Sequence, residues 1–194
     1  MTDPYTSRLT QLVTLVEEEA WADFGFLLFR TDYTNEQQWQ AFLEVKDQIL
    51  SEAIANAPRE SGLSRITDRM YIKQISNEAL AGITPEQVAI AYRSLEEADT
   101  EGEGAEDRIE PGLRTNVCLL VDGECMRSVV EGGVPFVKAV DVMLGEDEEV
   151  EGSYSGVFRV AICSLFTEFY LAQVECGEVG ELVPEGKGVW RGVA

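Results

Sequence analysis

Arg30, Asp32 and Tyr33 are the residues of this sequence that come nearest to a binding group, because they follow the apolar run Phe24–Phe29. On a strand over residues 21–33, Arg30 and Asp32 share one face and Tyr33 lies on the other. An arginine whose stem is buried along a sheet needs an anionic partner. That partner is either a carboxylate, from Asp32 or a distant segment, or a ligand anion that Tyr33 also contacts. We favour the internal carboxylate, which would fix the corner between this strand and the next helix.

Tyr71 and Lys73 add a second predicted strand to this group, at the end of residues 63–75. They share one face of that strand by alternation. Arg65 and Arg69 precede Lys73 at equal spacing and would form a positive strip on a continuous strand. Pairing with the protein's own carboxylates explains this strip more simply than a binding site does. The candidate binding residues for a small anionic ligand are Arg30, Asp32, Tyr33, Tyr71 and Lys73, and no catalytic residue is assigned.

Histidine is absent from all 194 residues, which excludes several kinds of chemistry. A Ser-His-Asp or Cys-His catalytic group, a histidine general base and an imidazole metal site all require it. The four cysteines have no Cys-x-x-Cys spacing, and neither a Gly-x-Gly-x-x-Gly motif nor a phosphate-loop signature occurs. We therefore expect neither a metal site nor a cofactor. Cys125 would be a reactive thiol if it lay at a helix N-terminus, but we do not assign it that role.

Charge and composition limit the partners and the location. The formal net charge is −21, from 36 acidic and 15 basic residues. A surface this negative repels phosphate backbones and anionic lipids, so we expect no binding to nucleic acid or to membranes. No apolar run approaches about 20 residues, the length of a membrane-spanning helix, and the N-terminus has no signal-peptide pattern. These features, with cysteines that show no paired spacing, indicate a reduced, cytoplasmic protein.

Helical periodicity and capping signals define the first half of the chain. Residues 7–20 form an amphipathic helix, which we expect to be peripheral. The opening strand leads into a helix over residues 34–57, where Thr34 and Gln37 form a capping box. The clearest local signal is the segment 84–87, in which a threonine cap, a proline at the first helical position and a closing glutamine begin another helix.

Strands alternate with helices in the second half. A helix is predicted from Ser164 to about Glu175, and Val189 and Trp190 of the irregular tail add to the body of the protein. Asp122-Gly123 allows two interpretations, a tight hairpin turn or the cap of a short helix, and we favour the helix. Strands are predicted over residues 116–121, 135–143 and 157–163.

Two acidic segments, residues 96–112 and 144–156, are too polar to pack, and we expect mobile loop insertions there. Strands resume after each of them, so we predict one domain over residues 1–194, with residues 1–20 as its peripheral helix. The order of elements favours an α+β fold, a two-layer α/β sandwich with a ferredoxin-like (split βαβ) core. A doubly wound sheet would need more crossover helices than the pattern provides.

The opening strand also carries a resemblance. Gly25-Phe26-x-x-Phe29-Arg30-Thr31-x-Tyr33, followed by Trp39, resembles the start of a family of proteins from filamentous fungi to which no activity has been assigned. The capped helix at residues 84–85 and the segment 121–122 have similar places in that family, and the likeness extends over residues 22–175. The resemblance implies a single cytosolic α+β domain and no particular chemistry.

Two functions are consistent with these patterns. The first is a non-enzymatic domain that binds a small ligand or a protein partner, which includes a homodimer formed through a sheet face or edge. It is favoured because no catalytic set converges while aromatic residues are abundant. The alternative is a cofactor-free enzyme that uses carboxylate and tyrosine acid–base groups in a sheet-lined pocket. That alternative requires a pocket near Arg30, Asp32, Tyr33 or Tyr71 that contains a carboxyl group of raised pKa.

Overall fold

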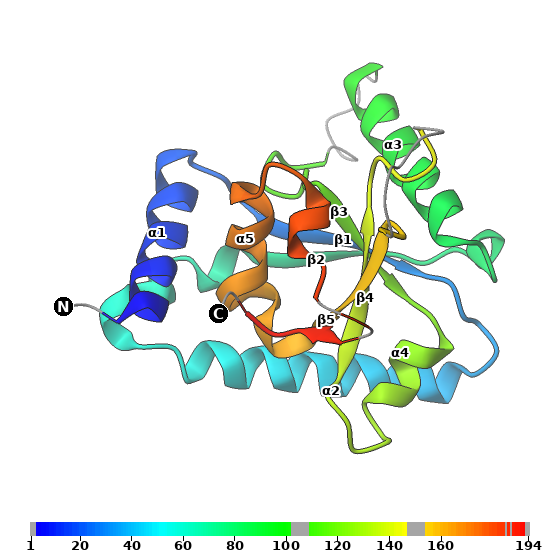
Figure 1. The fold of residues 1–194 in the computed structure, drawn as a ribbon, viewed down its shortest axis with the longest axis horizontal. Coiled ribbons are helices and arrows are strands. Elements are labelled where there is room, and N and C mark those ends of the chain that lie inside the picture. The colour runs from blue at the N-terminus through cyan, green and yellow to red at the C-terminus, as the bar shows by residue number, and fades with distance from the viewer. Residues whose placement is uncertain (1–2, 102–108, 147–153, 185, 187, 193–194) are drawn as a thin grey trace.

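The fold is built on one mixed sheet with the strand order β2-β1-β3-β4-β5-β6. A computed structural model describes residues 3–101, 109–146, 154–184, 186 and 188–192 (Figure 1). Neighbouring strands are parallel in the pairs β1–β2, β1–β3 and β5–β6, and antiparallel in β3–β4 and β4–β5. The strands are β1 (Phe24–Arg30), β2 (Met70–Ile75), β3 (Val117–Val121), β4 (Phe136–Asp141), β5 (Val157–Ala161) and β6 (Val189–Trp190).

Helices cover both faces of this sheet (Figure 1). The α-helices are α1 (Pro4–Glu18), α2 (Glu36–Ala55), α3 (Pro85–Glu101), α4 (Gly123–Ser128) and α5 (Tyr170–Glu175). Phe26 and Leu28 of β1 belong to the core that α1, α2 and α5 share, whereas Leu27 and Phe29 belong to the core beneath α3. Side chains of a strand alternate between faces, so a strand that is apolar at every position lies between two layers of helices.

The α+β class fits this structure, but two finer predictions about the fold are wrong. The strand order is not that of a ferredoxin-like sheet, and the helices form layers on both faces instead of one. The connection from β1 through α2 leads to β2 at the edge, and the connection through α3 returns past β1 to β3. Two crossovers on opposite faces are therefore sufficient for a small doubly wound unit, β2-β1-β3, to which the antiparallel strands are added.

The centre of the fold is the opening strand β1, all of whose residues are buried. Its aromatic residues pack against the segment before and within α5: the ring centroids of Phe26 and Phe169 are 5.8 Å apart, and those of Phe24 and Tyr170 are 5.1 Å apart. Gly25 has a φ of +146°, and a Cβ there would collide with the carbonyl oxygen of Tyr71 on β2. Glycine is therefore needed for the close pairing of β1 with β2.

Local capping predictions were confirmed for two helices and shifted for a third. Thr84 Oγ1 accepts from the Gln87 N–H and Gln87 Oε1 accepts from the Thr84 N–H, which is the predicted capping box of α3. Asp122 caps α4, so residues 122–130 contain a helix and not a hairpin. Helix α2 is capped one residue later than predicted, by Asn35, whose Oδ1 accepts from Gln38.

Other elements differ from prediction because distant contacts decide them. Residues 59–69 form short 3₁₀ turns, so Arg65 and Arg69 do not share a strand face with Lys73. Arg65 pairs with Glu17 instead, and Arg69 donates to the carbonyl of Trp21. The predicted helix from Ser164 is a 3₁₀ turn and a π-helix, Leu165–Phe169, before α5 ends at Glu175 as expected. Ser164 donates to the Arg191 carbonyl and does not cap a helix.

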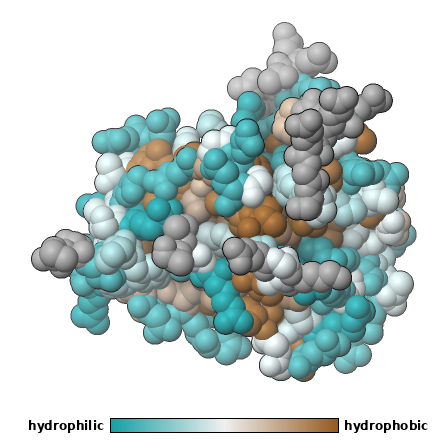
Figure 2. Space-filling view, in the orientation of Figure 1, coloured by the Kyte–Doolittle hydropathy of each residue, from teal (hydrophilic) through white to brown (hydrophobic). Residues whose placement is uncertain are grey.

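The two predicted acidic loops lie partly outside the described residues. Helix α3 continues to Glu101, further than predicted, and residues 102–108 are not described. In the second segment, residues 144–146 form a turn and residues 147–153 are not described. Over the described residues, none of the helices combines the length and apolar character needed to cross a membrane. In the view of Figure 2, hydrophilic residues cover most of the periphery and hydrophobic residues are exposed near the middle.

Candidate functional site

A pocket of about 640 Å³ lies where the parallel strands β1 and β3 end. Two connections begin at this edge, the one from β1 to α2 on one face of the sheet and the one from β2 to α3 on the other, so the pocket is at the topological switch point, where open α/β sheets usually bind ligands. We call it the switch-point pocket. Its lining is mainly apolar with a few polar groups, and consists of Thr31, Asp32, Tyr33, Thr34, Ala81, Gly82, Ile83, Pro85, Leu120, Asp122, Gly123, Lys138 and Val157.

Asp32 enters the pocket from the loop after β1 and is held by its own turn. Its Oδ1 accepts from the backbone N–H of Thr34 at 2.8 Å and from the Thr34 hydroxyl at 2.6 Å. Its Oδ2 lies against the loop after β3, where a Cβ on Gly123 would be 2.5 Å away. No donor in the described part of the chain forms a hydrogen bond or ion pair with Oδ2. One oxygen therefore fixes the side chain and the other remains available.

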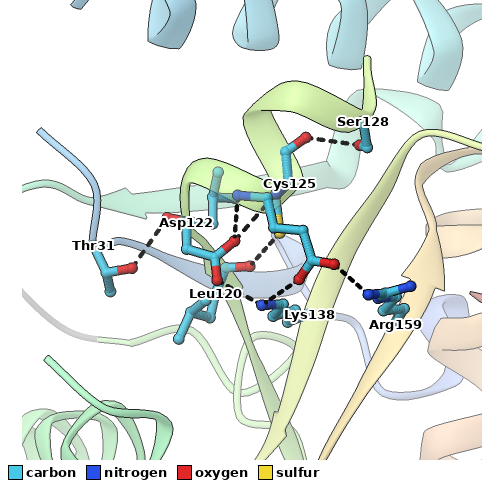
Figure 3. Close-up of polar contacts among 9 residues, drawn as sticks. Thr31, Leu120, Asp122, Cys125, Ser128, Lys138 and Arg159 are labelled. Carbon is cyan, nitrogen blue, oxygen red and sulfur yellow. Dashed lines mark hydrogen bonds and ion pairs between the residues drawn. The ribbon is translucent and has the colours of Figure 1, made fainter. Parts of the chain in front are cut away.

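Asp122 and Lys138 form the second polar group of the pocket (Figure 3). Asp122 follows β3, and its Oδ1 caps α4 by accepting from the N–H groups of Glu124 and Cys125 at 3.0 and 3.1 Å. Its Oδ2 lies 2.6 Å from Lys138 Nζ on the neighbouring strand β4. Lys138 Nζ also lies 2.8 Å from Glu124 Oε2. Through these two ion pairs, Lys138 connects the middle of β4 to the end of β3 and to the first turn of α4.

These contacts decide the charge of both groups. Burial alone would raise the pKa of Asp122, but the Lys138 ammonium and the Cys125 N–H outweigh burial and the pKa is below its ordinary value. Burial alone would lower the pKa of Lys138, but the carboxylates of Asp122 and Glu124 raise it above its ordinary value. At neutral pH the pair is a carboxylate and an ammonium.

The ion pairs continue from Lys138 to the next strand. Arg159 of β5 stands beside Lys138 in the antiparallel ladder and pairs with the same Glu124 (Figure 3). The Arg159 guanidinium also lies 4.8 Å from the centre of the Phe136 ring. Glu124 therefore links two cations on adjacent strands. Ion pairs with Asp122 and with Glu124 hold Lys138 in place at the wall of the pocket.

Arg30 lies outside the pocket, and its guanidinium contacts internal partners. Its side chain is 6% exposed, its Nη2 lies 2.7 Å from Glu36 Oε2, and its Nε donates to the Asp32 carbonyl. The guanidinium lies between the rings of Tyr33 and Trp39, at 4.3 and 4.7 Å from their centres. It fixes the corner between β1 and α2, as favoured from the sequence, but its carboxylate partner is Glu36 and not Asp32.

The other candidate residues separate into two groups. Tyr33 lines the pocket beside Asp32, and its hydroxyl oxygen accepts from the Asn77 N–H at 2.7 Å. Tyr71 and Lys73 lie on β2 beside Gly25 and Leu27, before the carboxyl end of β1, and do not line the pocket. Only Asp32 and Tyr33 of the five candidates are thus brought together at the switch point.

Cys125 lies in the first turn of α4, but it is fully buried and its thiol donates to the Leu120 carbonyl. Burial strongly raises its pKa, so it lacks the thiolate that a reactive cysteine needs. In the described segments, no three His, Cys, Asp or Glu side chains are grouped so that they could hold a metal ion.

Sequence reasoning missed Lys138 and Gly123 as site residues and treated Asp122 only as a cap. The available signal was the recurrence of aspartate at the end of two buried strands, since Asp32 and Asp122 both follow apolar runs. Parallel strands bring their carboxyl ends to one edge of a sheet, but this signal has meaning only once β1 and β3 are known to be parallel neighbours.

Comparison of the chain with family models, with curated proteins and with solved structures found no match. The functional interpretation therefore depends on the geometry of the switch-point pocket.

Proposed function

We propose that this chain is a non-enzymatic binding protein whose small-molecule ligand occupies the switch-point pocket. The observation that carries the proposal is the position of this pocket at the carboxyl ends of β1 and β3, with Asp32 and the Asp122–Lys138 pair in its wall. Its volume of about 640 Å³ lies within the usual range for ligand pockets, and its mainly apolar lining with few polar groups is typical of them.

Binding is better supported than acid–base catalysis. A catalytic acid or base works best when its pKa is near the working pH. The contacts of Asp122 and Lys138 move their pKa values away from neutrality in opposite directions. A permanently charged pair can orient a ligand, but it exchanges no proton with one at neutral pH. Tyr33, the tyrosine of the pocket, uses its hydroxyl oxygen to accept from the Asn77 N–H.

The test is a ligand screen with a variant that fills the pocket. Ala81 is exposed and lines the pocket, so Ala81→Trp adds a bulky side chain at its mouth and deletes no buried contact. Ala79→Trp is the matched control, because Ala79 is exposed in the same loop but outside the lining. A library of small metabolites is screened by thermal shift against the wild type and both variants.

The expected result is at least one compound that raises the melting temperature of the wild type and of Ala79→Trp but not of Ala81→Trp. A ligand that binds only the folded state stabilises it by RT ln(1 + [L]/Kd), so lost binding removes the shift. Compounds that stabilise all three proteins equally bind elsewhere. If every stabilising compound behaves in that way, the proposed site is refuted.

We also propose a cytoplasmic location and membership of the filamentous-fungal family. The location is supported by the cysteines, since Cys118, Cys125, Cys163 and Cys176 are all free. The family is supported by the motif around Gly25 and Arg30.

A protein partner or a second copy of the chain would contact the molecule away from the switch-point pocket, because the pocket has the size of a small-molecule site.

A further inference from the structure

The ligand-facing charge of the switch-point pocket is negative. Two carboxylates, Asp32 and Asp122, and one ammonium, Lys138, line it. The ammonium is already neutralised, because Asp122 and Glu124 lie 2.6 and 2.8 Å from it. Among the charged groups of this lining, Asp32 alone keeps an oxygen, Oδ2, to which no donor of the described residues is bound.

The helix N-termini at this edge are already capped, which disfavours a phosphate there. At a switch point, an anionic ligand is usually held by the free N–H groups that begin a helix. Here α2, α3 and α4 all begin at this edge, and each is capped by the chain itself. Asn35 Oδ1 accepts from Gln38, Thr84 Oγ1 from Gln87, and Asp122 Oδ1 from Glu124 and Cys125.

We infer that the switch-point pocket selects an organic cation: an amine with an apolar body, whose ammonium group binds Asp32 Oδ2. The apolar body would lie on Leu120, Ile83 and Val157, which line the same pocket. The net charge of −21 attracts such a ligand and repels anions. This inference depends on the proposed function. The ligand is opposite in charge to the small anion that the sequence left open as the alternative, and Arg30, which would have held that anion, is occupied by Glu36.

Arg127 is the internal cation that competes for this position. Its Nη1 would lie 3.2 Å from a Cβ on Gly123, close to the space that Asp32 Oδ2 approaches. However, Arg127 is exposed, its Nε pairs with Glu131 at 3.8 Å, and it forms no ion pair with Asp32. A ligand ammonium therefore meets a free carboxylate oxygen with an exposed arginine nearby, and removing that arginine should favour the ligand.

Three probes of the same shape and different charge test the inference at pH 7: phenethylamine, 2-phenylethanol and phenylacetate. Binding is measured by ¹⁵N NMR from the backbone N–H signals of Gly82 and Gly123, both of which line the pocket. We expect phenethylamine to shift both signals and to bind about tenfold more tightly than the alcohol, the gain of one charge-assisted hydrogen bond. Phenylacetate should bind more weakly than either.

Two variants locate the effect at Asp32. Asp32→Asn keeps the Oδ1 acceptor for both Thr34 donors but loses the charge, so phenethylamine should bind about as weakly as the alcohol while the alcohol is unaffected. Arg127→Gln leaves Asp32 unchanged and removes the competing cation, so the amine should bind at least as tightly as to the wild type. A dispersed NMR spectrum verifies the fold of each variant.

The inference is wrong if no probe shifts the Gly82 and Gly123 signals, if the alcohol or phenylacetate binds as tightly as the amine, or if Asp32→Asn leaves amine binding intact. It is also wrong if Arg127→Gln weakens binding, because Arg127 would then be the ligand-recognising group. These failures can be distinguished from failure of the proposed function. If the Ala81→Trp screen shows that anionic or neutral compounds bind in the pocket, the pocket is a binding site and only its selectivity for cations is wrong.

Discussion

Asp32 Oδ2 lies so close to the backbone of Gly123 that a Cβ at position 123 would be 2.5 Å from it. Such a distance is shorter than two non-bonded atoms of this kind allow. The carboxylate cannot simply turn away, because its Oδ1 is bound twice by Thr34. The loops that follow β1 and β3 therefore meet at Gly123, and glycine is required there by close approach.

Gly123→Ala should consequently lower the free energy of unfolding by about 1 kcal/mol, the usual cost of an added methyl group in a packed place. The measurement is urea unfolding. A loss of stability is informative because Gly123 begins α4 and alanine is the better helix former, so helix propensity alone predicts that Gly123→Ala raises stability. In an Asp32→Ala background, Gly123→Ala should cost little further stability, since the colliding carboxylate is then absent; this comparison allows for the two Thr34 hydrogen bonds that Asp32→Ala itself removes.

Gly133→Ala is the matched control for this change. A Cβ at Gly133 would have no atom within 4 Å, and its φ is outside the left-handed region. This substitution should leave stability unchanged or raise it slightly, by restricting the unfolded chain. Equal losses at positions 123 and 133 would contradict the steric explanation.

The Asp122–Lys138 pair should make a pH-dependent contribution to stability. The pKa of Asp122 is lowered in the folded state, so its contribution is complete above its ordinary pKa of 3.8 and is lost as pH falls through the folded value. The pKa of Lys138 is raised, so its contribution is complete below the ordinary 10.5 and is lost as pH rises through the folded value.

Lys138→Met removes the pair, and the difference in unfolding free energy between wild type and variant should form a plateau between about pH 5 and pH 10. Outside that range the difference should shrink on both sides. Lys73→Met is the control, because Lys73 makes no hydrogen bond or ion pair in the described part of the chain. The difference in unfolding free energy between wild type and Lys73→Met should not depend on pH in this way. A Lys138→Met difference that stays constant from pH 3 to pH 11 would mean that the pair does not stabilise the fold.

Arg30 and Glu36 should make unequal contributions, although they form one ion pair. Arg30 is 6% exposed and lies between two aromatic rings, whereas the Glu36 side chain is 64% exposed. Arg30→Met should lower the free energy of unfolding by about 2 kcal/mol, through lost ring contacts and the lost bond to the Asp32 carbonyl. Glu36→Gln should change stability little, because exposed ion pairs contribute weakly. Equal losses from both variants in urea unfolding would assign the stabilisation to the ion pair itself.

Much of the fold could be predicted from local sequence. Three predictions were confirmed that each depend on only a few consecutive residues: the buried strand β1, the capping box of Thr84 and Gln87, and the Asp122 cap. Such signals work because the backbone N–H groups that begin a helix must find an acceptor within three residues. They define where elements begin, but not which elements are neighbours.

The sheet order and the site could not be predicted because they depend on distant pairings. Lys138 becomes a site residue only because β4 is paired with β3, which brings it to Asp122. The partner of Arg30 is near in sequence, but it depends on the direction in which the chain turns: Glu36 pairs with Arg30 because the first turn of α2 lies over the end of β1. The π-helix before α5 reflects the packing of Phe166 and Phe169 on β1, for which the sequence has no local signal.

The reactivity of the cysteines should follow burial. Cys163 is exposed and Cys176 is half-buried, whereas Cys118 and Cys125 are buried and their pKa values are strongly raised by desolvation. Because the thiolate is the reacting form, Ellman's reagent at pH 8 should modify Cys163 rapidly and Cys176 slowly. The two buried thiols should react only after unfolding in guanidinium chloride. Cys163→Ser should remove the rapid phase, and a rapid phase that survives this change but disappears in Cys125→Ala would show that the thiol at the start of α4 is reactive after all.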